Sequence, residues 1–361
     1  MTDLPIRLGL VGTGKIAQMM HLPFIEELPG VEVVACADIS AGTMNMVADR
    51  FGIPGRYTDN SALIADPQVD AVLICNFDHP DVAESAIRAG KHVLIEKPLA
   101  FTLAEARKLA ELAAASGVTA MVGYMKLYDA GTEAAATALA GIGPLRTVHV
   151  HDFAGRFDVA DGLYRLERAD DVPPEALLAG RRAVEAKVAA ELGESHAGYR
   201  DLMIRMLMIG SHDLAVMRHL LGRPERVAYA RPVSDFQTLA VLEFPGGVPC
   251  VLELAIGAKY NHWDESLTAY GERDEIRVEF AHPYHRYGAT MLRCRGGDRE
   301  SPVETVTAVS NEPAFKRELR DFVACIREGR AVTSTLEGAA EDVQLMQEII
   351  LAMPPRPATG V

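Results

Sequence analysis

The stretch IRLGLVGTGKIA, residues 6–17, joins a short apolar run to a glycine-rich turn. Its first six residues are typical of a buried parallel strand. In the G-x-G-x-x-A pattern that follows, Gly12 permits a tight turn, Gly14 leaves room for a pyrophosphate, and Ala17 is small enough for close helix–strand packing. A helix expected over residues 15–28 would direct its N-terminus at phosphates. The stretch therefore predicts a strand–turn–helix unit that binds a dinucleotide.

An acidic residue ends the next expected strand, residues 31–37. Asp38 follows Gly14 by 24 residues, and a carboxylate near that spacing can accept hydrogen bonds from both ribose hydroxyls of an adenosine. Because Asp38 would repel a 2′-phosphate and no arginine follows it, NAD is favoured over NADP as the cofactor. On its own, Asp38 would also suit a turn at the strand end. The residues expected to bind the cofactor in this part of the chain are Gly12, Thr13, Gly14, Lys15, Ile16 and Asp38.

Strands and helices go on alternating, with strands expected at residues 70–76 and 91–100 and helices near 60–65 and 81–89. This alternation predicts a parallel sheet with helices on both faces, a Rossmann domain over residues 1–122. Ligands of such sheets bind at the carboxyl ends of the strands. Further cofactor-binding residues expected at that edge are Asn76, His79, Glu96 and Lys97.

The composition limits the class of protein. The chain has 361 residues, 49% hydrophobic and 24% charged, with a net charge of −14, which suits two globular domains. An acidic surface repels nucleic acid and anionic membranes, so a small-molecule or protein partner is favoured. Five scattered cysteines indicate a reducing compartment, and no apolar run reaches the ~20 residues of a membrane span. We expect a cytoplasmic protein without a bound metal, because its histidine-rich stretches match no zinc spacing.

The second part of the chain, residues 123–361, is expected to bind the substrate and to oligomerise. Residues 173–192 have the spacing of a helix, which we interpret as an insertion that either edges the substrate pocket or serves oligomerisation. The terminal residues 353–361, MPPRPATGV, are expected to be frayed. Expected strands, several of them separated by turn signals, lie at residues 147–155, 237–244, 249–258, 266–271 and 274–280.

The apolar stretch RMLMIGSHDLAVM, residues 205–217, contains one histidine. Gly210 and Ser211 interrupt the run, and Ser211 is a good N-cap for a helix that Gly222 ends. His212 is therefore expected in the first helical turn, where the positive helix end disfavours its charged form. A neutral imidazole can serve as a base, although a single histidine among apolar residues is also compatible with a place in the core.

Five motifs together resemble the Gfo/Idh/MocA oxidoreductases, the family of glucose–fructose oxidoreductase and inositol dehydrogenase. The resemblance implies an N-terminal Rossmann domain and a C-terminal α/β domain with an open, mostly antiparallel sheet. That sheet often forms the oligomer interface, so a homo-oligomer, dimer or tetramer, is expected. The motifs are VGTGKIA at 11–17, EKPLA at 96–100, GYMKLYDAG at 123–131, GSHDLAVMRHLLG at 210–222 and FKRELRDFVACIREGR at 315–330.

In this family the lysine of E-K-P is catalytic, which implies that role for Lys97. A lysine at the crevice, partly desolvated, could share its proton with a substrate hydroxyl. The family pattern D-x-G-x-H matches here at Gly210 and His212, which implies that His212 also handles the proton. The pattern departs at Met208, where the family has an aspartate, and a methionine can neither accept a proton nor bind a hydroxyl. Met125-Lys126 likewise stands where the family often has Asn-Arg.

The resemblance favours an NAD-dependent oxidoreductase that transfers a hydride between a small sugar, cyclitol or related polyol and the nicotinamide. Two alternatives stay open: an NAD-using glycoside-processing enzyme without net redox change, and a non-catalytic NAD-binding sensor. The residues expected to bind the substrate are Lys97, Tyr124, Asp152, Tyr199, Met208, His212 and His262.

Overall fold

The structure is a computed structural model that describes residues 4–155, 162–256 and 260–358, and the chain divides into two compact units. The expected boundary at residue 122 lies two residues before Tyr124, where the first continuous stretch of the first unit ends. The sequence leaves open that the C-terminal helices pack back on the first domain, and two later segments do belong to this unit. The first unit comprises residues 1–124, 160–186 and 315–343, and the second comprises 125–159, 187–314 and 344–361.

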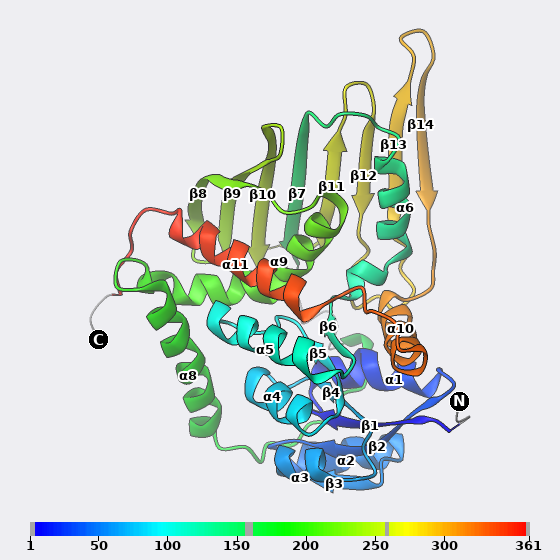
Figure 1. Ribbon diagram of the computed structural model, residues 1–361, viewed down its shortest axis with the longest axis vertical. Helices are drawn as coiled ribbons and strands as arrows, with labels where there is room; N and C mark the ends of the chain where they lie inside the picture. The colour runs from blue at the N-terminus through cyan, green and yellow to red at the C-terminus, as the bar shows by residue number, and fades with distance from the viewer. Residues whose placement is uncertain (1–3, 156–161, 257–259, 359–361) are drawn as a thin grey trace. The chain divides into compact units, whose positions relative to one another are not determined.

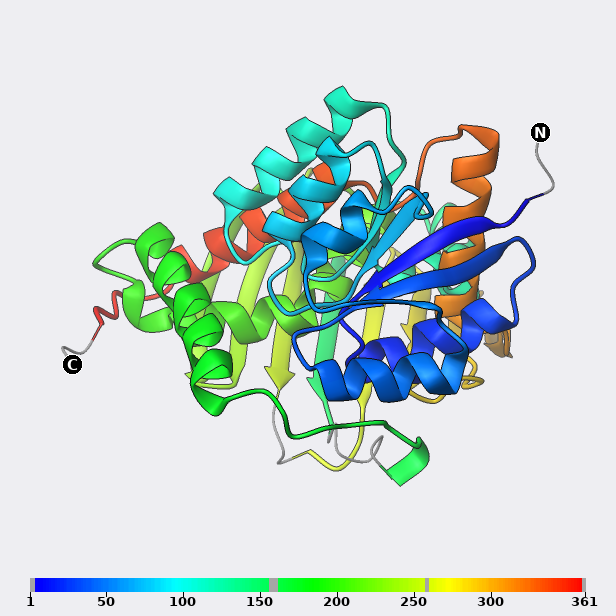
Figure 2. The same cartoon turned by 90° about the horizontal axis from the view of Figure 1, so that it is seen from below.

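A six-stranded parallel sheet forms the centre of the first unit, in the order β3-β2-β1-β4-β5-β6 (Figures 1 and 2). This order confirms the Rossmann fold, and it brings the carboxyl ends of β1, β2, β4 and β5 to one edge. The strands are β1 Ile6–Val11, β2 Val31–Ala37, β3 Gly55–Tyr57, β4 Ala71–Ile74, β5 His92–Glu96 and β6 Ala120–Gly123. The helices in or entering this unit are η1 Ala17–His21, α1 Leu22–Glu26, α2 Ala41–Phe51, α3 Asn60–Ala65, α4 Pro80–Arg88, α5 Leu103–Ser116, α8 Pro174–Leu192, α10 Ala314–Glu328 and α11 Leu336–Leu351.

The helix after the glycine turn starts where expected but changes its hydrogen-bond register. Its first part, η1, is a π-helix, and Pro23 stands at the start of α1. Proline has no amide hydrogen, so the regular bonding pattern cannot run through it. The next helix, α2, is capped by Ser40, whose hydroxyl accepts from the Thr43 amide.

An eight-stranded sheet forms the centre of the second unit, in the order β14-β13-β12-β11-β7-β10-β9-β8 (Figure 1). Only the central β7–β10 pair is parallel among the described strands, which confirms the mostly antiparallel sheet. Three strands, β8, β13 and β14, were not expected, and residues 257 and 258 of one expected strand lie outside the described residues. The strands are β7 Thr147–Ala154, β8 Arg226–Ser234, β9 Gln237–Phe244, β10 Val248–Ile256, β11 Asp264–Tyr270, β12 Glu275–Glu279, β13 Met291–Gly297 and β14 Pro302–Ala308.

Helix α9 corrects the expected position of His212. It runs unbroken over Arg200–Leu221, so Ser211 does not cap it and His212 lies in its second half, far from the positive end. Gly210 does not interrupt the helix because it serves packing: an added Cβ would lie 2.3 Å from a methyl of Leu254 on β10. The glycine lets helix and sheet approach closely. The other helices of this unit are η2 Met125–Tyr128, α6 Ala130–Leu139 and η3 Ala197–Tyr199.

The expectation of a frayed C-terminus is wrong for residues 353–358. The Gly198 amide donates to the Arg356 carbonyl at 2.8 Å, and the Tyr199 hydroxyl donates to the Pro354 carbonyl at 2.9 Å. The guanidinium of Arg356 also lies over the Tyr199 ring. These backbone and ring contacts hold the segment against η3.

No helix within the described parts of the chain is long and apolar enough to cross a membrane.

Candidate functional site

The glycine turn of the first unit is shaped to admit a phosphate group. Gly12 has a φ of +89°, and an added Cβ would lie 2.7 Å from the backbone nitrogen of Asn76. Gly14 differs, because an added Cβ would meet nothing within 4 Å. Gly12 is therefore required by its conformation and packing, whereas Gly14 faces space that a ligand can enter. Lys15 and Ile16 follow as the start of the helix, so their amides lie at its N-terminus.

Asp38 is fixed beside that turn. One of its carboxylate oxygens accepts from the amide of Thr13 at 2.7 Å and from the Thr13 hydroxyl at 3.0 Å, and the other accepts from the Ser40 amide at 2.9 Å. The side chain is half-buried, so both oxygens keep room to accept from ribose hydroxyls. The residues present fit a dinucleotide: a strand end, an open glycine and an oriented acid share one edge.

The Glu96-Lys97-Pro98 turn follows β5 at the same edge of the sheet. Glu96 is buried, receives a hydrogen bond from the Lys97 amide at 3.1 Å and contacts Nε2 of His21 at 2.7 Å. The Lys97–Pro98 peptide bond is cis, a possibility that the sequence leaves open. His79 is buried and its Nδ1 lies 2.8 Å from the Pro98 carbonyl. Two histidines, His21 in η1 and His79 at the N-cap of α4, therefore hold the turn that carries the half-buried Lys97.

The two buried groups beside this turn, Glu96 and His79, differ in charge. Burial opposes the charged form of Glu96, but the hydrogen bond from His21, together with the charges of His21, Lys97 and His79, outweighs burial and lowers the pKa of the carboxyl. Burial lowers the pKa of His79, which keeps that imidazole neutral. Lys97 therefore stands beside an ionised carboxylate. Sequence reasoning missed His21. Its position four residues after Ala17, about one helical turn along, could have indicated that its side chain points the same way as that of Ala17.

Glu318 of α10 is a second buried acid that sequence reasoning missed. It is fully buried, and neither carboxyl oxygen has a hydrogen-bond partner among the described residues. Burial, together with the charge of Glu96, raises the pKa of Glu318 well above its ordinary value. The group is therefore held protonated, and α10 brings an uncharged carboxyl toward the charged one that supports Lys97.

In the second unit, His212 and Met208 share one face of α9. They are four residues apart on a continuous helix, so their side chains are neighbours. His212 is half-buried and Met208 is 39% exposed, so this face is partly open. The structure thus places the methionine next to the histidine, as the family pattern implies for the missing aspartate.

A buried cluster of four charged residues lies in the second unit, contributed by η2, β7, α9 and β11. Its members are Lys126, Asp152, Asp213 and Glu265, each at most 4% exposed. The ammonium of Lys126 forms an ion pair with Glu265, lies over the ring of Phe280 at 5.1 Å, and contacts the ring of Trp263. Carboxylate oxygens of the three acids lie within 4.8 Å of one another.

Burial determines the protonation of this cluster. It raises the pKa of Asp213, although the charge of Lys126 and a hydrogen bond with Asp152 oppose that shift, and it lowers the pKa of Lys126. Three acids at this spacing resemble a metal-ligand set, but the ammonium of Lys126 supplies the cation. Sequence reasoning named Asp152 and Lys126 and missed Glu265, which gave no signal because its partners are distant in sequence.

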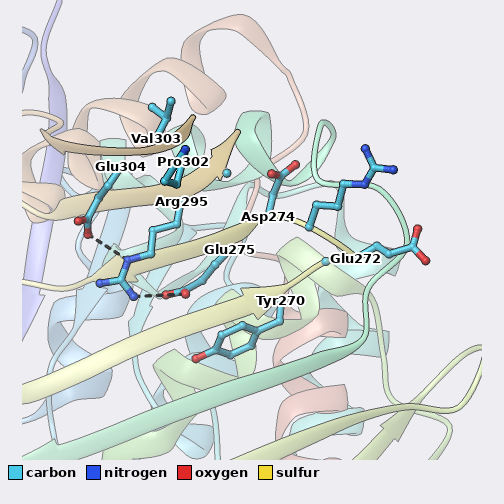
Figure 3. A pocket seen from close by; sticks show the side chains of 11 residues that line it. Tyr270, Glu272, Asp274, Glu275, Arg295, Pro302, Val303 and Glu304 are labelled. Carbon is cyan, nitrogen blue, oxygen red and sulfur yellow. Dashed lines mark hydrogen bonds and ion pairs between the residues drawn. The ribbon is translucent and has the colours of Figure 1, made fainter. Parts of the chain in front are cut away.

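The other substrate-binding candidates have different surroundings within their own units. Tyr124 is fully buried in the first unit. In the second unit the Tyr199 hydroxyl is engaged by the C-terminal segment, whereas His262 is exposed. A separate open pocket lies at the ends of β11 to β14, where Arg295 bridges Glu275 and Glu304 (Figure 3). None of the expected site residues lines that pocket.

Comparison with known families agrees with this architecture. A model described as "Oxidoreductase family, NAD-binding Rossmann fold" matches residues 6–124, and one described as "Oxidoreductase family, C-terminal alpha/beta domain" matches residues 206–357. Together they match most of the chain. The chain belongs to the Gfo/Idh/MocA oxidoreductase family.

Individual proteins that resemble this chain share limited sequence identity with it or match only part of it. An inositol 2-dehydrogenase of Pseudomonas savastanoi is 39% identical over 135 residues, which span 36% of this chain and 40% of that protein. A myo-inositol 2-dehydrogenase of Thermotoga maritima is 22% identical over 337 residues, 90% of this chain and 89% of that protein. A solved structure of KijD10, a 3-ketoreductase from Actinomadura kijaniata in complex with NADP, has a TM-score of 0.72 at 20% identity, covering 97% and 98% of the two chains. That likeness supports the fold.

Proposed function

We propose that this protein is an NAD-dependent oxidoreductase that acts on a CH–OH group of a sugar, cyclitol or related polyol. The observation that carries the proposal is the Lys97 turn, which Glu96, His21 and His79 hold at the sheet edge shared with the glycine turn. The names of two relatives, both inositol dehydrogenases, support the substrate class.

The chain's own residues would divide the work between binding and proton transfer. Bound NAD would supply the hydride acceptor. Gly14 would let its pyrophosphate approach, and Asp38 would hold the adenosine ribose. Lys97, beside the ionised Glu96, would bind the reacting hydroxyl and share its proton. His212 is the second proposed proton carrier, working without the neighbouring carboxylate that the family has.

The preference for NAD over NADP is part of this proposal. The KijD10 structures contain NADP, so family membership alone leaves the choice open. The argument for NAD is the Asp38 carboxylate, which hydrogen bonds from Thr13 and Ser40 hold beside the glycine turn. A 2′-phosphate there would face a like charge.

A screen of sugars and cyclitols with NAD and with NADP tests the proposal, read as formation of reduced nicotinamide. We expect turnover with NAD and at least one polyol. Turnover without added cofactor, with copurifying NAD, would favour glycoside processing without net redox change. Binding of NAD without any turnover would favour a sensor. Either result would overturn the proposed activity.

We also propose that the chain forms a homo-oligomer through its open sheet, as the family resemblance implies. Light scattering coupled to size-exclusion chromatography would measure the mass in solution. A monomer at micromolar concentration would contradict this part of the proposal.

A further inference from the structure

A segment that follows β7 in the sequence lies along the β2–α2 edge of the first unit (Figures 1 and 2). Gln18 pairs with the backbone of Glu167 in both directions, at 2.7 and 3.0 Å. The guanidinium of Arg50 donates to the Arg165 carbonyl at 2.6 Å. The amide of Ala169 donates to the Thr43 hydroxyl at 3.0 Å. Residues 165–171, here called the strap, are thus fixed by backbone hydrogen bonds on the helices after β1 and β2.

The strap ends with a carboxylate at the N-terminus of α2. Asp171 accepts hydrogen bonds from the Ser40 hydroxyl and, at 2.7 Å, from the Gly42 amide. Both bonds lower the pKa of Asp171, and the bond from Ser40 has the larger effect, so the carboxyl is ionised. Gly42 makes the approach possible, because an added Cβ would lie 2.5 Å from the Cβ of Ala169. An anion supplied by the chain itself therefore occupies the hydroxyl and amide donors of this helix end.

This position is next to the residue proposed to hold the adenosine ribose. The amide of Ser40 donates to Asp38 at 2.9 Å, while its hydroxyl donates to Asp171. Ser40 therefore lies between two carboxylates. A 2′-phosphate on a ribose held by Asp38 would need donors just beyond that residue, and the nearest are the Ser40 hydroxyl and the first amides of α2.

We propose that Asp171 is a specificity-determining residue that excludes NADP by filling, with its own carboxylate, the anion position that a 2′-phosphate would need. The inference rests on the proposed function, because it presumes that a nicotinamide dinucleotide binds this edge. It extends that proposal by assigning the discrimination between NAD and NADP to two carboxylates. Asp38 engages the ribose hydroxyls of NAD, and Asp171 blocks the phosphate of NADP by occupancy and by charge.

Calorimetric titration of the whole protein with NAD and with NADP tests this, without any need for substrate. Asp171→Asn keeps the shape but removes the charge, and Asp171→Ser also empties the position. We expect both to lower the Kd for NADP by roughly tenfold at low ionic strength, with the Kd for NAD unchanged. The gain of Asp171→Asn should shrink in high salt, since an exposed charge is screened. Both variants should fold, because Asp171 is exposed.

Arg50→Gln is the matched control, because it loosens the other end of the strap and leaves the carboxylate in place. It should not change the ratio of the two dissociation constants. If wild type prefers NAD and neither Asp171 variant improves NADP binding, the inference is overturned while the cofactor choice stands on Asp38. Equal gains in Arg50→Gln and the Asp171 variants would also overturn it, since the strap would then act only by its bulk. A wild type that prefers NADP overturns the proposed cofactor choice itself.

Discussion

The two units stabilise their buried charges in different ways. In the first unit, Glu96 is paired with a histidine and a backbone amide, and its neighbours along the chain form the site. In the second unit, Lys126 is surrounded by acids from three other elements and by aromatic rings. The first arrangement depends on a short motif, whereas the second exists only after η2, β7, α9 and β11 have come together.

This difference predicts whether a substitution changes catalysis or stability. Around Lys97 the supporting charges orient a half-buried side chain, so substitution of Lys97 should change chemistry more than stability. Around Lys126 the charges neutralise one another in a buried place, so removing one should change stability first. Substitutions at Lys97 and at Lys126 therefore separate the two cases.

Lys97→Ala should reduce kcat by roughly 10²–10⁴, the usual contribution of a positioned proton-transfer group, while NAD binding and the melting temperature stay close to wild type. Steady-state kinetics and NAD titration measure both effects. Lys97→Met controls for the length of the side chain. An unchanged kcat in both variants would remove Lys97 from the mechanism.

Lys126→Met should lower the free energy of unfolding by about 3–5 kcal/mol, because it leaves Glu265 buried and uncompensated. Denaturant titration measures the loss. The double variant Lys126→Met, Glu265→Gln should recover much of it, since no unpaired charge then remains at that position. A loss below about 1 kcal/mol in the single variant would show that the cluster does not depend on its cation.

Asp38→Ala should weaken NAD binding by about 1–3 kcal/mol, because two hydrogen bonds to the ribose are lost. It should also reduce the discrimination against NADP. Thr13→Val tests whether the orientation of the carboxylate matters, since the Thr13 hydroxyl donates to Asp38. NAD affinity that survives the loss of Asp38 would separate this residue from the cofactor.

Glu318→Gln should stabilise the protein, increasingly so as the pH rises. The pKa of Glu318 is raised in the folded state, so between the ordinary value near 4.5 and the raised one the folded chain binds more protons than the unfolded chain. Wild-type stability must then fall with rising pH, by up to ~1.4 kcal/mol per pH unit from this group. Unfolding free energies at several pH values test it; the two proteins should agree below pH 4.5 and diverge above it. A constant difference would show that Glu318 does not titrate abnormally.

Met208→Asp should move the acid limb of the oxidation rate to higher pH, because a carboxylate one helical turn from His212 favours the protonated imidazole. We expect a shift of up to about one pH unit at this partly open face. The isosteric Met208→Leu should leave the profile in place. If both variants keep the wild-type profile while His212→Asn keeps full activity, His212 has no part in proton transfer.

Local sequence patterns predict the strand, glycine turn, helix and acid of the first unit, the Glu96-Lys97-Pro98 turn and most strands of the second unit. These features are local: a few consecutive residues decide a turn, a cap or an alternating strand, so the chain carries them without reference to distant parts. The resemblance to the Gfo/Idh/MocA oxidoreductases is carried by such short motifs as well.

Contacts between residues that are distant in sequence arise only in the folded chain. In the sequence Gly210 suggests a helix break, whereas in the structure it lies inside α9 and allows Leu254 to pack closely. For this reason the expected position of His212 at a helix start was wrong. Glu265 forms an ion pair with Lys126, and Asp171 accepts a hydrogen bond from Ser40, which lies 131 residues earlier in the sequence. No periodic pattern in the sequence predicts either contact. Burial then sets the protonation of Asp213 and Glu318. Desolvation is a property of the folded environment, so residue order alone cannot specify it.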